Sequence, residues 1–69
     1  MTVGEMLGWT NRLKDIEQMK EPQRSIRLGV MMSDMEGAYS IPALRNEAFE
    51  KKNPFVMELY RTVSSERSL

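Results

Sequence analysis

The feature that most limits this chain is that it is short and carries neither cysteine nor histidine. Its 69 residues allow one domain at most. A domain of this size buries only about 60% of the surface that its unfolded chain exposes. Small domains therefore usually rely on disulfides, a bound metal or association with another subunit. Here no disulfide is possible and a zinc site lacks its usual ligands. The sequence predicts helix packing or self-association instead, with no metal and no cofactor.

The balance of charges argues against a polyanionic partner. The chain has 10 Lys and Arg residues and 10 Asp and Glu residues, so its formal net charge is zero. A neutral chain has no overall field to draw it to nucleic acid or to an anionic membrane. It also has little charge repulsion to keep its copies apart.

Nothing in the sequence predicts a membrane segment or a signal peptide. The longest unbroken apolar run is Val30 to Met32, whereas a transmembrane helix needs about 20 apolar residues. The first ten residues have neither the basic start nor the apolar stretch of a signal peptide. We therefore expect a soluble, cytoplasmic protein without membrane contact.

Three prolines divide the chain into helical segments. Residues that precede proline are pushed away from helical geometry, while proline itself is favoured in the first helical turn. Pro22, Pro42 and Pro54 therefore each predict the start of a helix. Apolar residues recur at helical spacing in each segment. The predicted helices are 3–20, 22–38, 42–52 and 54–64, which form a single domain over 1–64 with a flexible tail at 65–69.

Capping residues support several of these boundaries. Thr2 with Glu5 three residues later has the pattern of a capping box. Gly37 suits the end of the second helix. Asn53 is a strong N-cap for a helix that begins with Pro54.

These segments predict an all-α fold, because no stretch alternates apolar and polar residues as a strand would. We expect a small bundle of three to four short helices, in which the first two form an antiparallel hairpin about the turn at 20–23. Residues on the apolar faces of these helices form the predicted core, namely Leu13, Ile16, Leu28, Met31, Met35, Leu44, Leu59 and Val63.

The second predicted helix is apolar on two sides, as expected for the central helix of a bundle. Leu28, Met31 and Met35 lie on one side, and Ile26 with Val30 lies on the other. Methionine is common both in irregular cores and at adaptable binding surfaces, so its cluster fits either role. The residues that could contact a partner are Trp9, Ile26, Val30, Met31, Met32, Met35, Tyr39 and Phe55.

Catalysis is not predicted, since the chain lacks the side chains that most often serve as nucleophile or general base. We assign no catalytic residue. Apolar helical surface, in contrast, exceeds what one small core can hide. The leading hypothesis is a small accessory or regulatory protein that acts by helix-mediated protein–protein contact, with a homodimer as one form of it.

The alternative hypothesis is a helix-turn-helix DNA-binding protein centred on residues 28–52. A helix that ends near Gly37 and a second that begins near Pro42 have this outline, and Arg45, Asn46 and Lys52 would then reach the DNA. A DNA-binding helix normally carries excess basic residues for phosphate contacts. Glu47 and Glu50 on the same predicted helix count against this hypothesis.

Overall fold

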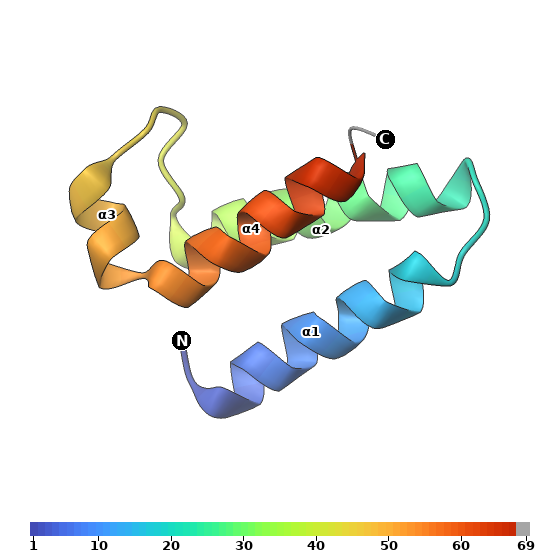
Figure 1. Cartoon of the computed structure of the whole chain (residues 1–69), viewed down its shortest axis with the longest axis horizontal. Helices are drawn as coiled ribbons and strands as arrows, with labels where there is room; N and C mark the ends of the chain where they lie inside the picture. The colour runs from blue at the N-terminus through green and yellow to red at the C-terminus, as the bar shows by residue number, and fades with distance from the viewer. Residues whose placement is uncertain (68–69) are drawn as a thin grey trace.

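A computed structural model describes residues 1–67 and shows four α-helices, with no strand in that range (Figure 1). The first two helices run in opposite directions and pack against each other. Both the all-α fold and the helical hairpin predicted from the sequence are therefore confirmed. In chain order the helices are α1 (Val3–Glu17), α2 (Gln23–Tyr39), α3 (Glu47–Lys52) and α4 (Pro54–Arg67).

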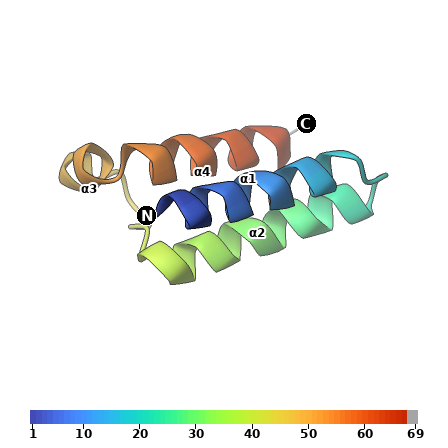
Figure 2. The same cartoon turned by 90° about the horizontal axis from the view of Figure 1, so that it is seen from below.

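The central helix is α2, which packs against α4 and α1, while the short α3 contacts α4. Figure 2 shows α1 and α4 together on one side of α2. The core lies at this three-helix junction, and seven of the eight predicted core residues are buried in it. Leu44 is the exception, and Val56, which was not among the predicted core residues, is buried as well. The buried residues are Leu13, Ile16, Leu28, Met31, Met35, Val56, Leu59 and Val63.

The start of α1 confirms the predicted capping box. The Thr2 hydroxyl accepts a hydrogen bond from the Glu5 amide at 3.1 Å, and the Glu5 carboxylate accepts one from the Thr2 amide at 3.4 Å. The helix ends at Glu17, three residues before the predicted end. There the chain tightens, because the Met19 amide bonds to the Ile16 carbonyl, three residues back, at 3.0 Å.

Pro22 lies directly before the first residue of α2, close to the predicted start, whereas the helix ends at a residue other than the one predicted. Glu21 supports the start, since its carboxylate accepts hydrogen bonds from the Ser25 amide at 2.8 Å and the Ser25 hydroxyl at 2.6 Å. The peptide bond between Glu21 and Pro22 is cis. Gly37 lies within the helix, so its predicted role as a cap is wrong. Ser40 ends the helix instead, in the left-handed conformation at φ 53°.

The third helix is shorter than predicted, and this exposes Leu44. Only Glu47–Lys52 is helical, rather than all of 42–52. Asn46 sets the start, because its side-chain oxygen accepts a hydrogen bond from the Phe49 amide at 3.0 Å. Leu44 therefore lies in an irregular loop and is 83% exposed. Its predicted place in the core is wrong.

The fourth helix begins at Pro54 as predicted. The Asn53 side chain turns back toward α3 and donates to the Phe49 carbonyl oxygen at 3.1 Å. Residues 65–67, which the sequence placed in a tail, belong to α4. The last part of the predicted tail, residues 68–69, lies outside the described residues. Within the described range, none of the helices has the length and apolar character needed to cross a bilayer.

Candidate functional site

An apolar face of α2 points away from the core, and we call it the outer face of α2. At 100° per residue its members lie within an arc of about 60° on the helix. Ile26 is 56% exposed and Val30 is 41% exposed, although both are large apolar residues. The outer face consists of Ile26, Val30, Ser33 and Gly37.

The neighbouring helices cover the other sides of α2. On one flank Asp34 contacts α1, where the Arg12 guanidinium lies 2.7 Å from its carboxylate. On the other flank Glu36 contacts α4 by accepting a hydrogen bond from the Tyr60 hydroxyl. The outer face lies between these two flanks on the helical wheel. Figure 2 shows that no other element of the described chain covers this side of α2.

Gly37 has no role within the described chain that explains its presence. A side-chain carbon added there would have no neighbouring atom within 4 Å. Its backbone does not adopt the positive φ that favours glycine. Glycine inside a helix costs about 0.5–1 kcal/mol relative to alanine. The outer face therefore includes a gap in its side-chain surface that the protein's own packing does not use.

Trp9 links α1 to the end of α2. Its ring nitrogen donates to the Tyr39 hydroxyl at 2.7 Å, and that hydroxyl donates to a Glu5 carboxylate oxygen at 2.7 Å. The hydrogen bond from Tyr39 and the backbone bond from Thr2 lower the pKa of Glu5. Burial and the bond to Glu5 raise the pKa of Tyr39. Arg12 also lies 5.5 Å from the centre of the Trp9 ring. Most of the polar capacity of Trp9 and Tyr39 is thus used inside the chain.

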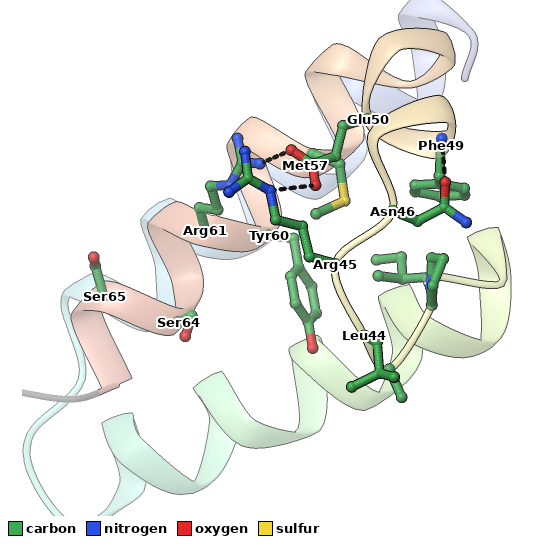
Figure 3. Close-up of a pocket in the computed structure, with 13 residues that line it drawn as sticks. Leu44, Arg45, Asn46, Phe49, Glu50, Met57, Tyr60, Arg61, Ser64 and Ser65 are labelled. Atoms are coloured by element: carbon green, nitrogen blue, oxygen red, sulfur yellow. Dashed lines mark hydrogen bonds and ion pairs between the residues drawn. The ribbon is translucent and has the colours of Figure 1, made fainter.

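A groove lies beside α3, between the loop that follows α2 and the outer side of α4 (Figure 3). Its volume is about 880 Å³, and its apolar walls include Leu44, Phe49 and Met57. Its charged groups are two arginines that share one glutamate. Glu50 pairs with Arg61 and also lies 3.7 Å from the Arg45 guanidinium.

Tyr60 also lines this groove, and its hydroxyl is held by Glu36 of α2. That hydrogen bond, together with burial and the negative charge of Glu36, raises the pKa of Tyr60 to about 12. The hydroxyl is protonated at neutral pH, as an ordinary tyrosine is, and its bond to Glu36 ties α4 to α2. We conclude that the groove offers apolar walls, while several of its polar groups already serve the fold.

The structure separates the predicted contact residues into three groups. Met31 and Met35 are fully buried and fill the junction of α2 with its neighbours, which is the core role that the sequence also predicted for them. Ile26 and Val30 are exposed on the outer face of α2. The remaining predicted contact residues are partly buried and pack against the core, namely Trp9, Met32, Tyr39 and Phe55.

Ser33 and Gly37 belong to the outer face but were not among the predicted contact residues. Their positions on the helical wheel carry the signal, since they follow Val30 by three and seven residues on the same side of α2. The groove beside α3 was also not predicted from the sequence. It depends on an irregular loop at a position where helix was predicted, which brings Arg45 close to Glu50.

The residues named for DNA contact do not share one role. Arg45 lies beside Glu50, and Asn46 caps α3 with its side chain. Lys52 is exposed in the last turn of α3, which has only six residues. The DNA-binding hypothesis stays a prediction. Comparison with known protein families, curated proteins and solved structures found no match.

Proposed function

We propose that this protein is a small, non-enzymatic accessory or regulatory protein that binds other proteins through the outer face of α2. The observation that carries the proposal is the exposure of Ile26 and Val30 on a helix whose opposite side is fully packed. Contiguous exposed apolar surface on a small protein commonly marks a contact site.

The overall dimensions support this proposal. The accessible surface is 4865 Å², whereas a compact monomer of 8.0 kDa would expose about 4,450 Å². The radius of gyration is 12.0 Å, compared with about 11 Å for a typical domain of this length. The molecule is also flat, with extents of 36 × 26 × 17 Å. It therefore exposes more surface than its size requires.

The chemistry of the outer face suits a helix of a partner. Full burial of an isoleucine or valine side chain contributes about 1.5–3 kcal/mol. Ser33 and Gly37 add little bulk, so a partner backbone can approach α2 closely at these positions. The charged residues on the flank, such as Arg27 and Asp34, would set the orientation of the partner more than its affinity.

Two further features fit a binding protein better than an enzyme. The chain contains no histidine or cysteine to act as a proton carrier or nucleophile. The charged groups beside α3 pair with one another rather than converging on an empty centre. A chain without cysteine also suits a reducing compartment, and we propose that the protein acts in the cytoplasm.

Pull-down from an extract of the source cells tests the proposal. Wild-type protein is compared with the double variant Ile26→Lys/Val30→Lys and with the matched control Leu7→Lys. Leu7 is exposed on α1, so its replacement adds a charge at a site outside the outer face. We expect a partner that wild type and the control retain and the double variant loses. Purified components should then show the same difference in calorimetry. Equal retention by all three proteins would contradict the proposal.

A further inference from the structure

We propose that the outer face of α2 binds the same face of a second copy of this chain, with the two α2 helices antiparallel. The inference rests on the proposed function and names the partner for that surface. The twofold axis would lie between the two outer faces, level with the point midway between Met31 and Met32 along the helix. Ile26 of each copy then faces Gly37 of the other, and Val30 faces Ser33.

The sizes of the facing residues are complementary in this arrangement. Ile26 and Val30 are the large members of the outer face, and both lie in the first half of α2. Ser33 and Gly37 are the small members, and both lie in the second half. Antiparallel pairing therefore places each large side chain against a small one. The open space at Gly37, which nothing in the described chain fills, receives the side chain of Ile26 from the second copy.

The charges along α2 are complementary in the same sense. Arg27 lies in the first half of the helix, and Asp34 lies in the second. Within residues 1–67 no acidic group forms an ion pair with Arg27. On the helical wheel Arg27 and Asp34 share one flank, so each Arg27 comes near Asp34 of the second copy. One oxygen of Asp34 binds Arg12, and the Asp34 side chain remains 50% exposed.

Parallel pairing of the same faces satisfies neither condition. It would set Gly37 against Gly37 and leave a gap between the helices. It would also bring Asp34 near Glu36 of the second copy, where like charges repel. The zero net charge of the chain adds no overall repulsion between copies. Both α1 and α4 lie on one side of α2, and the buried residues of α2 pack there, which leaves the outer face to the second copy.

Cysteine cross-linking tests this arrangement, because the chain has no cysteine of its own. Ile26→Cys and Gly37→Cys are prepared as separate variants, and both positions are exposed. A disulfide needs Cα atoms within about 7 Å. In the antiparallel pair the two copies of position 26 lie about 16 Å apart along the helix, as do the two copies of position 37. Under mild oxidation we expect the mixture to form a heterodimer, while each variant alone stays largely unlinked.

Several outcomes would overturn the inference. Efficient linkage of Ile26→Cys to itself would indicate parallel pairing. Linkage at equal rates in all mixtures, including one with the control Leu7→Cys, would indicate random collision. If nothing links while the pull-down loses its partner in Ile26→Lys/Val30→Lys, the outer face binds a different protein. In that last case the proposed function stands and only the second copy is wrong.

Discussion

The two faces of α2 have similar apolar residues and opposite surroundings. On the inner face Leu28, Met31 and Met35 are fully buried, whereas Ile26 and Val30 on the outer face remain exposed. The difference arises from the placement of α1 and α4, which both lie on the inner side (Figure 2). Apolar character alone therefore does not show what a face of this helix does. We expect the inner face to hold the fold and the outer face to bind a partner.

The largest expected effect is a difference in unfolding free energy between substitutions on the inner and outer faces of α2. Leu28→Ala removes a fully buried side chain and should lower the free energy of unfolding by about 2–5 kcal/mol. Ile26→Ala removes a side chain that is already half in water, so its cost in the monomer should be below about 1 kcal/mol. Urea unfolding of dilute protein measures both values. Similar losses for the two variants would remove the distinction between the faces.

A smaller effect is expected at the end of α2, where Tyr39 connects it to α1. Tyr39→Phe keeps the ring but leaves the ring nitrogen of Trp9 and the carboxylate of Glu5 without their shared partner. We expect a loss of about 1–2 kcal/mol in unfolding free energy, together with a change in Trp9 fluorescence. An unchanged stability would mean that α1 is held to α2 by apolar contacts alone.

The outer face also offers a stabilising substitution. Gly37→Ala should raise the unfolding free energy of the monomer by about 0.5–1 kcal/mol, because it lies inside a helix with open space at the new side chain. Gly29 is the matched control. There a new carbon would make ordinary van der Waals contact with the Arg67 guanidinium at 3.4 Å, so Gly29→Ala should gain at least as much. A gain at Gly29 without one at Gly37 would contradict this explanation of the Gly37 variant.

The smallest effect is expected at Glu66, which lies near the end of α4, close to the start of α2. A hydrogen bond with Glu17, partial burial and the negative charge of Glu17 raise the pKa of Glu66. The folded state therefore binds this proton more tightly than the unfolded chain does. Its contribution to stability grows as the pH falls from neutral toward 4.5, the ordinary pKa of a glutamate, and is lost as the pH rises through the raised pKa.

Glu66→Gln removes this titration and the repulsion from Glu17. We expect a gain of a few tenths of a kcal/mol at neutral pH, about the size of a like-charge pair on a helix. Unfolding curves at several pH values should show a smaller gain in stability on mild acidification than wild type does. Glu5 and Glu21 have lowered pKa values, so the stability that these two carboxylates contribute is lost only at more acidic pH. If the unfolding free energy of Glu66→Gln changed with pH just as that of wild type does, this explanation would be contradicted.

Much of the fold could be predicted because local signals decide it. Helical spacing of apolar residues located the core on α1, α2 and α4, and Thr2 with Glu5 marked the first helix start. Pro54 marked the last start in the same way. The loop after α2 could not be predicted, because Asn46 overrides the helix start that Pro42 suggested. Leu44 lies in this loop, which is why its predicted burial was wrong.

The candidate site could be predicted only in part. Periodicity showed that α2 has two apolar sides, and Ile26 and Val30 were placed on one of them. It also placed Leu28, Met31 and Met35 in the core, but it could not show that Ile26 and Val30 would stay uncovered, because that depends on long-range packing. The methionines were therefore assigned to both roles, and Met31 and Met35 proved to be core. Gly37 was interpreted as a cap, which hid its place on the outer face.

Sedimentation equilibrium over a range of protein concentrations tests the division between the two faces most directly. Wild type, Val30→Lys and the control Leu7→Lys are compared after each is shown to unfold with the same free energy when dilute. We predict that the average mass of wild type and the control rises from 8.0 kDa toward twice that value, while Val30→Lys stays at the monomer mass. A wild type that remains monomeric at every concentration, or a Val30→Lys variant that associates as wild type does, would contradict the account.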